Sequence, residues 1–433
     1  MNKRRYISIS KVCLQMAENL VFYETLRMFP PAGNIPKVAA EDTTLVTHNS
    51  AGEPVIVPVP QGTYLTLHLV GMHYHPLYWN DPAMFQPARF LAPDFPRDAF
   101  LPFSGGARAC LGRRFFETEG IAILTMLISK FKIEVKNEAE FAGESFEEKK
   151  ARIFQSREGL TMTFVVCSYY MNMVSLNTGP SGLCTSLWSS KDVNSATQVL
   201  LIVVAIGLWV SIKQITAHRA KFPKPVEEYT ALSFFGRNIV ASEGEEWKRY
   251  RKVTAPAFSE PNNKLVWDET VRIMNGLFDD VWAGKDTIIV DHAVEITLPI
   301  ALFVIGAAGF GRRISWEDDL IIPAGHKMTF KDSLHHASMD IPFKASFPDW
   351  FLQYAPSKRL NRCKAAYDEL DMFMTEMVQA RRNAEKKEER YDLFSSLLDA
   401  SEGEQDGGAI LTDRELLGSW ACYDFVRRVL MCS

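Results

Sequence analysis

One cysteine of this chain lies within a pattern of residues that suits metal chemistry. The pattern F-x-x-G-x-R-x-C-x-G is matched by residues 103–112, FSGGARACLG. An apolar helical pattern follows directly, so a thiolate at Cys110 would lie near the positive end of a helix dipole. A thiolate stabilised in this way is a ligand for iron. We therefore identify Cys110 as the candidate metal ligand.

The other fixed positions of this loop each suit a task beside a flat ligand. Gly106 and Gly112 lack a Cβ, so the backbone can turn close to such a ligand. Arg108 can pair with a carboxylate through two parallel hydrogen bonds. Phe103 would shield the sulfur from water. Plain apolar packing, the ordinary role of a lone cysteine, leaves these four neighbours unexplained.

The loop resembles the haem-binding loop of the cytochrome P450 family. Residues 24–31 (ETLRMFPP) are similar to the E-x-x-R helix of that family, and residues 85–90 (FQPARF) to its P-E-R-F segment, with alanine replacing the usual glutamate. The resemblance implies that Glu24, Arg27 and Arg89 form a buried charge triad. The triad would fix the fold around the cysteine loop, because charge left unpaired in a core is costly.

A further segment, residues 247–251 (WKRYR), resembles the W-x-x-x-R helix of the family. A spacing of four puts Trp247 and Arg251 on one helical face. By resemblance, these two residues and Arg108 hold the propionates of a haem, and Lys37 stands where an arginine commonly contacts a propionate. The implied cofactor is haem b, an iron protoporphyrin with the Cys110 thiolate as its axial ligand.

The resemblance implies a haem-thiolate monooxygenase that inserts one oxygen atom into an apolar small molecule. The implied partners are molecular oxygen, an NADPH-dependent reductase and a membrane. The acid–alcohol motif A-G-x-[D/E]-T, which supplies protons in the family, is absent, so no catalytic residue is assigned; the nearest string is Asp268-Glu269-Thr270. Two alternatives stay open: a non-enzymatic haem-binding or unstable fusion remnant, and a haem-thiolate isomerase or peroxygenase, which needs no such motif.

The segments that resemble the family are transposed along the chain. The half with the haem ligand, 1–167, precedes the half with the early helices, 221–433. Between them we predict a linker at 168–195 and a hydrophobic membrane-anchor segment at 196–220. The long central helix of the family has no counterpart in either half. We interpret the chain as a fusion of the C-terminal half of one copy with the N-terminal half of another, in the genome or in the gene model. Circular permutation is the alternative, but it would keep the central helix.

The hydrophobic segment sets the expected location. Residues 199–212 (VLLIVVAIGLWVSI) carry no charge, whereas a full span needs about 20 residues. Basic residues and two prolines follow, which favours an anchor over a buried core helix. We expect a membrane-associated protein at the endoplasmic reticulum that faces the cytosol. A segment that spans would separate the halves, so assembly requires it to lie flat or to insert from one side.

Composition limits the remaining possibilities. The 433 residues contain 48 Lys+Arg and 52 Asp+Glu, a formal net charge of −4, which argues against a nucleic-acid partner. Seven widely spaced cysteines without a C-x-x-C pair give no disulfide framework or zinc knuckle. Seven of the nine histidines are interpreted as surface or core residues rather than metal ligands; they are His48, His68, His73, His75, His292, His335 and His336.

The expected fold is mainly α with a small β region in the first half. It is an incomplete and reordered cytochrome P450-like fold that lacks the long central helix. In the β region, the runs Pro54–Pro60 and Thr63–Val70 flank Gln61-Gly62, which predicts a hairpin. Whether the two halves pack around one core is left open by the sequence.

Overall fold

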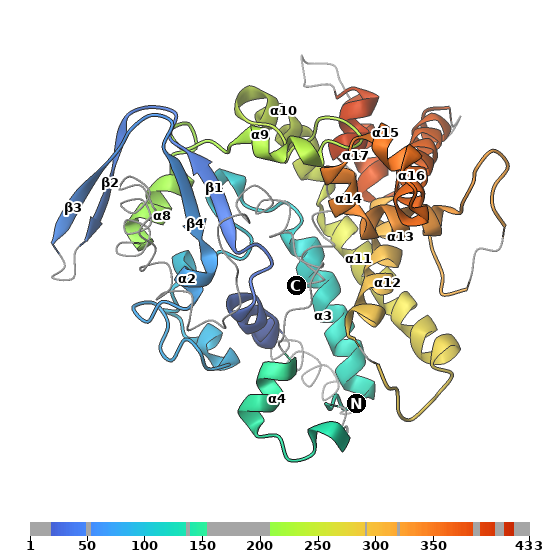
Figure 1. The fold of residues 1–433 in the computed structure, drawn as a ribbon, viewed down its shortest axis with the longest axis horizontal. Coiled ribbons are helices and arrows are strands. Elements are labelled where there is room, and N and C mark those ends of the chain that lie inside the picture. Colours follow the sequence, from blue (N-terminus) through green and yellow to red (C-terminus); the bar gives the residue numbers. More distant parts are fainter. Residues whose placement is uncertain are drawn as a thin grey trace, which may run out of the picture.

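The computed structural model describes residues 19–48, 53–135, 139–153, 208–290, 292–317, 321–383, 390–402 and 411–419. The predicted linker, 168–195, lies outside the described residues, as does the part of the hydrophobic segment before residue 208. The described chain is mainly helical with a small β region, which confirms the expected fold class. Figure 1 shows the strands on one side, the long helices on the other, and α3 (Arg113–Lys130) between them.

Four strands form two antiparallel pairs. β1 (Asn34–Val38) pairs with β4 (Tyr64–His68), and β2 (Thr43–His48) pairs with β3 (Pro54–Val59). The prediction of a hairpin at Gln61-Gly62 is therefore wrong, because the strands on either side of this turn pair elsewhere. The turn is instead tied to the end of β1. The Gly62 N–H donates to the Ala39 carbonyl at 2.8 Å, and the Gln61 N–H donates to Asp42 at 2.7 Å.

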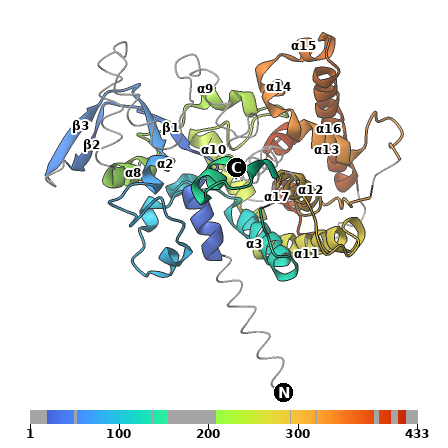
Figure 2. The same cartoon turned by 60° about the horizontal axis from the view of Figure 1, so that its bottom comes forward.

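The helix α8 (Leu208–Ala217) packs on β2, and both views show it beside the strands (Figures 1 and 2). Ile212 and Ile215 are buried in the apolar cluster that fills the β region. The backbone N–H of Val46 in β2 donates to the Gln214 side chain at 3.2 Å. Although α8 follows the linker in sequence, it forms part of the core of the first half.

This packing bears on the predicted membrane anchor at 196–220, of which only the part from residue 208 is described. None of the helices in the described ranges combines the length and the apolar character that a bilayer crossing requires. A transmembrane helix is therefore not supported there. The buried isoleucines of α8 instead match the alternative of a core helix, and the location at a membrane stays a prediction.

The segment after α8 also joins the two halves through the backbone. The Val38 N–H donates to the Pro223 carbonyl at 3.0 Å, and the Ala40 N–H donates to the Lys221 carbonyl at 2.9 Å. Residues 221–223 thus lie alongside the end of β1. Hydrogen bonds between backbone groups satisfy an edge that would otherwise be exposed.

The helical part begins with α9 and continues to the last described residues. Its α-helices are α9 (Val226–Tyr229), α10 (Gly244–Thr254), α11 (Glu260–Gly276), α12 (Val294–Val304), α13 (Phe330–Met339), α14 (Ile341–Ser346), α15 (Asp349–Tyr354), α16 (Lys358–Arg382) and α17 (Leu393–Glu402). The first half also contains helical residues 19–28, which carry Glu24 and Arg27, together with α2 (Leu69–His73) and α4 (Phe146–Ile153).

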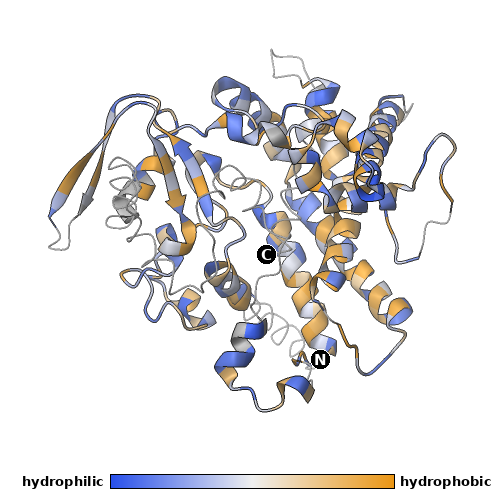
Figure 3. Ribbon diagram, viewed as in Figure 1, coloured by the Kyte–Doolittle hydropathy of each residue, from blue (hydrophilic) through white to orange (hydrophobic). Residues whose placement is uncertain are grey.

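The helix α3 of the first half packs against α11 of the second half. Phe115 and Ile123 of α3 share one large apolar cluster with Ile273 and Met274 of α11. Figure 3 shows the apolar residues that run along α3 and the neighbouring helices. The two halves therefore share one core, which answers the question that the sequence left open.

Candidate functional site

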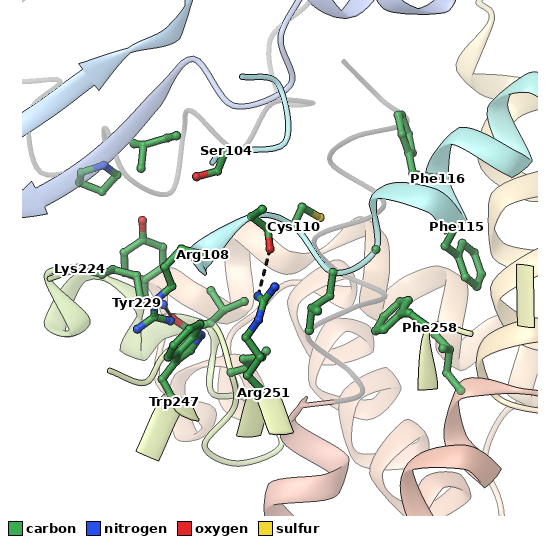
Figure 4. A pocket seen from close by; sticks show the side chains of 18 of the residues that line it. Ser104, Arg108, Cys110, Phe115, Phe116, Lys224, Tyr229, Trp247, Arg251 and Phe258 are labelled. Carbon is green, nitrogen blue, oxygen red and sulfur yellow. Dashed lines mark hydrogen bonds between the residues drawn. The ribbon is translucent and has the colours of Figure 1, made fainter. Parts of the chain in front are cut away.

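A cavity of about 220 Å³ lies where the two halves meet. Strand β1 and the cysteine loop line it from the first half, while α10 and the residues before it line it from the second (Figure 4). Its side chains include Lys37, Ser104, Arg108, Cys110, Leu111, Phe115, Phe116, Lys224, Tyr229, Trp247, Arg251, Phe258, Ile305 and Leu393. The cavity thus combines one thiol, several cations and a largely apolar wall.

The loop that carries Cys110 is held by its own backbone. The Cys110 N–H donates to the Phe103 carbonyl at 2.9 Å, and α3 begins three residues after the cysteine, with Gly112 as its N-cap. Burial raises the pKa of the Cys110 thiol, whereas the N–H of Gly112 and the charge of Arg251 act in the opposite direction. A thiolate here needs a cationic partner to offset its burial, and a metal ion is such a partner.

Trp247 lies at the centre of a group of guanidinium groups. The Cζ atom of Arg108 is 3.9 Å from the centroid of the Trp247 ring, that of Arg219 is 4.5 Å away and that of Arg251 is 5.6 Å away. Arg251 also donates through Nη1 to the Ala109 carbonyl at 3.1 Å, as the dashed line in Figure 4 shows. The structure therefore brings Arg108, Trp247 and Arg251 together beside the cysteine loop, although Arg108 lies in the first half and the other two in the second.

Arg108 is engaged on one side only. Its Nη2 forms an ion pair with Glu243 and donates to the Ser242 carbonyl at 3.2 Å. Its Nε is buried and has no acceptor among the described residues. A buried donor without an acceptor costs about 1–3 kcal/mol, so this nitrogen indicates a place where a ligand oxygen would be favourable.

Lys37 lies on β1 and is 6% exposed, yet it lines the cavity. Burial lowers the pKa of its ammonium group; the Glu243 carboxylate opposes this shift and the nearby Arg108 charge adds to it. An amine of this kind is stabilised in its charged form when an anion binds next to it.

These observations test whether the residues fit a haem. Four cationic side chains line the cavity: Lys37, Arg108, Lys224 and Arg251. Within the described part of the chain, no aspartate or glutamate lines it. An excess of buried positive charge is unfavourable unless an anion neutralises it. A flat, apolar molecule with two carboxylates and an iron for the thiol satisfies all of these groups, so the residues fit haem.

The surroundings of Gly106 and Gly112 in the loop differ, so the two positions need glycine for different reasons. Gly106 has a φ of +65°, and a Cβ there would lie 2.5 Å from the Thr216 carbonyl oxygen of α8. The packing of α8 therefore requires a glycine at this position, which does not line the cavity, and a role of Gly106 beside a flat ligand stays a prediction. Gly112 lines the cavity, and a Cβ there would meet only Phe258 at an ordinary 3.8 Å, so close approach of a ligand stays the reason expected for it.

Phe103 does not line the cavity. It is buried in a small apolar cluster with Phe22 and Phe116, and Cys110 packs against that cluster. Its ring can thus limit the access of water to the cysteine without touching a ligand. Its carbonyl contributes as well, since it accepts the Cys110 N–H.

The three residues expected to form the charge triad lie together. Arg27 donates to both carboxylate oxygens of Glu24, at 2.8 and 2.9 Å, and Arg89 donates to Glu24 at 3.2 Å. Glu24 and Arg27 are fully buried. Arg27 also donates to the His73 carbonyl at 2.7 Å. Both buried charges are therefore well supplied with hydrogen bonds, which such a pair needs in order to be tolerated in a core.

His73 connects the triad to the segment that leads into the cysteine loop. Its Nε2 accepts the Leu101 N–H at 3.1 Å, so its Nδ1 carries the proton and donates to the Arg27 carbonyl at 3.0 Å. Burial lowers the pKa of His73 to about 4, which keeps the imidazole neutral. The sequence predicted a surface or core histidine, and His73 lies in the core; its bridging role had no sequence signal.

Glu243 is the other residue that sequence reasoning missed. It is the N-cap of α10, accepting from the Gly244 N–H at 3.2 Å, and it pairs with Arg108 across the junction of the halves. An acidic residue directly before a helix is the signal that could have drawn attention to it.

The string Asp268-Glu269-Thr270 lies on α11 and does not line the cavity. Glu269 is buried and pairs with Arg272 and Arg313, each at 2.7 Å. The Thr270 hydroxyl donates to a backbone carbonyl of its own helix at 2.7 Å. These contacts give the string a role in packing, so it does not replace the missing acid–alcohol motif.

Comparison with known proteins identifies the family. The model of the family described as cytochrome P450 matches residues 16–153 and 203–420, which is most of the chain. The chain therefore belongs to the cytochrome P450 family. Membership implies an iron-haem cofactor with a thiolate ligand.

Individual relatives are similar over shorter stretches. Cytochrome P450 monooxygenase 124 of Postia placenta is 51% identical over 249 residues, 55% of this chain and 48% of the relative. A cytochrome P450 monooxygenase of Arthrobotrys oligospora is 29% identical over 226 residues, 50% of this chain and 38% of the relative. Cytochrome P450 4A10 of Mus musculus is 38% identical over 112 residues, 25% of this chain and 20% of the relative. The chain thus spans about half or less of the length of these relatives. No solved structure matches it.

Proposed function

We propose that this chain binds haem b with the Cys110 thiolate as axial ligand and acts as a monooxygenase. It would insert one oxygen atom into an apolar small molecule. The observation that supports this most strongly is the cavity itself: the Cys110 thiol, just before α3, and four cations line the same cavity, and no carboxylate lines it within the described residues. Haem is a ligand that satisfies both features.

In this proposal the polar side chains nearest the cysteine loop hold the cofactor. Arg108, Arg251 and Lys37 pair with the propionates, and the Trp247 N–H donates to one of them. The backbone N–H groups at the start of α3 stabilise the charge on the Cys110 sulfur. Bound haem supplies the redox and oxygen chemistry. The proposed partners are molecular oxygen, an NADPH-dependent reductase and a membrane, with the protein at the endoplasmic reticulum and facing the cytosol.

A spectrum of the reduced chain with carbon monoxide tests the ligand. We expect the red-shifted Soret band that a thiolate ligand gives, and we expect Cys110→Ala to abolish it. Cys363 is the matched control, because it is fully buried in α16 and away from the cavity. The Cys363→Ala variant should keep the band. A band that survives Cys110→Ala would show that another residue binds the iron.

A second function, haem binding without turnover, is favoured by one observation. The nearest match to the acid–alcohol motif lies on α11, is committed to packing contacts and does not line the cavity. Product formation with a reductase separates the two functions, because only the monooxygenase gives product. Product with hydrogen peroxide but not with reductase would instead indicate a peroxygenase.

A further inference from the structure

Glu243 holds Arg108 from one side, and its own position is fixed by the backbone. One carboxylate oxygen accepts from Arg108 and from the Gly244 N–H, and the other accepts from the Lys224 N–H at 3.0 Å. The side chains of Arg108 and Glu243 are 12% and 17% exposed. A carboxylate with three donors in a largely buried place is well ordered, and it fixes the guanidinium with it.

The carboxylate lies behind the guanidinium with respect to the cavity. Arg108 lines the cavity, whereas Glu243 does not. Arginine favours a two-bond arrangement with one carboxylate, but here Glu243 takes only Nη2, since its second oxygen is engaged by Lys224. The buried Nε is left without an acceptor among the described residues. The pair therefore leaves a defined donor free for a second anion.

We infer that Glu243 is a positioning residue that orients Arg108 so that its free Nε can donate to a propionate of the haem. The inference rests on the haem binding proposed above. It assigns a role in cofactor recognition to a residue of the second half that does not touch the cofactor. A residue that competed with the propionate would have to occupy the cavity, and Glu243 does not line it.

The test compares two ligands that differ only in their carboxylates. Haem and haem dimethyl ester are titrated into the full chain, and the affinities are read from the Soret band. Glu243→Gln removes the charge and keeps the size of the side chain, and its single oxygen can still accept from one of the two N–H groups, Gly244 or Lys224, that bond to different oxygens of Glu243. We expect this variant to bind haem about ten- to a hundredfold more weakly, as is usual when such a supporting residue is lost. Its affinity for the ester should stay that of the unmodified chain, and Glu243→Asp should recover part of the affinity for haem.

Glu246→Gln is the matched control. Glu246 lies on the same helix and pairs with the exposed Arg237 at 2.7 Å, away from the cavity. The Glu246→Gln variant should bind haem and haem dimethyl ester with the affinities of the unmodified chain. Equal weakening of both ligands in Glu243→Gln would show a merely structural role and overturn the inference, and so would unchanged or tighter binding of haem. If the unmodified chain binds neither ligand, the proposed function itself fails; if it binds haem and Glu243→Gln makes no difference, only the positioning role fails.

Discussion

Arg251 donates to the carbonyl of Ala109, the residue just before the candidate iron ligand, at 3.1 Å across a sequence separation of 142 positions. The bond links the W-x-x-x-R helix of the second half to the cysteine loop of the first. In this family member a side chain from one half thus orients the backbone next to Cys110 in the other. The geometry of the loop consequently depends on both halves being present.

The first prediction concerns this bond. We expect Arg251→Ala to lower the affinity for haem about ten- to a hundredfold, because a hydrogen bond from a charged group contributes about 1.5–3 kcal/mol. Titration of the chain with haem, followed at the Soret band, measures the effect. Lys252→Ala is the control, since Lys252 is exposed on the same helix. Equal affinities for the two variants would contradict the role given to Arg251.

The second prediction concerns the buried histidine and pH. In the folded chain, burial lowers the pKa of His73 from its ordinary value of 6.5 to about 4. The unfolded chain therefore binds the proton more readily, and stability is lost as the pH falls from about 6.5 towards 4. From this residue alone we expect a loss of about 2 kcal/mol in the free energy of unfolding between pH 7 and pH 5.

Urea unfolding at the two pH values measures this loss. His73→Asn has no titrating group at this position, so its pH dependence should be smaller by that amount, whatever its stability at pH 7. A variant with the same pH dependence as the unmodified chain would show that His73 is not buried as a neutral imidazole.

The third prediction concerns the contact between the cysteine loop and α8. Gly106→Ala would place a Cβ 2.5 Å from the Thr216 carbonyl oxygen, at a φ of +65° that already disfavours alanine. We expect a loss of about 1–3 kcal/mol from this overpacking, in addition to about 1 kcal/mol of backbone strain.

Gly62→Ala separates the two contributions, because Gly62 has a φ of +79° but nothing within 4 Å of the added Cβ. Thermal unfolding of both variants gives the comparison. If Gly106→Ala and Gly62→Ala lower the stability by the same amount, α8 does not pack on the cysteine loop as described.

The fourth prediction concerns the buried triad. Glu24→Ala leaves the fully buried Arg27 without its carboxylate, and we expect a cost of about 3–5 kcal/mol. The control is Glu117→Ala, whose partner Arg113 has a half-exposed side chain, so that its loss should cost about 0–1 kcal/mol. Replacing Glu24 and Arg27 together by methionine should cost less than Glu24→Ala alone. Denaturant unfolding measures these losses in the free energy of unfolding. A loss for Glu24→Ala as small as that for Glu117→Ala would contradict the structural role of the triad.

The fifth prediction concerns the order of the halves. The cytochrome P450 family model matches two segments of the chain, 16–153 and 203–420, and these segments flank the predicted linker. A fusion in the genome predicts a single transcript that reads through the codons for 154–202. Separate transcripts that end and begin within that interval would instead place the junction in the gene model, and long-read sequencing of messenger RNA distinguishes the two.

Local patterns predicted much of this molecule. The cysteine loop and the segment around Glu24 each depend on residues that are close in sequence, so their spacing alone carries the information. The pairing of β4 could not be read in this way, because its partner β1 is distant in sequence and the turn at Gly62 is held by Ala39 and Asp42. The same applies to Glu243, since its partner Arg108 is 135 positions away.

The apolar contact between α3 and α11 has a consequence for how such genes can be rearranged. Each helix buries its apolar face against the other whichever is encoded first, because burial depends on contact and not on sequence order. If the two parts of a coding region are joined in the opposite order, this apolar contact can still form as long as both helices are translated. The positions at which such a gene can be divided are therefore set by contacts in the protein interior rather than by the positions of the chain termini.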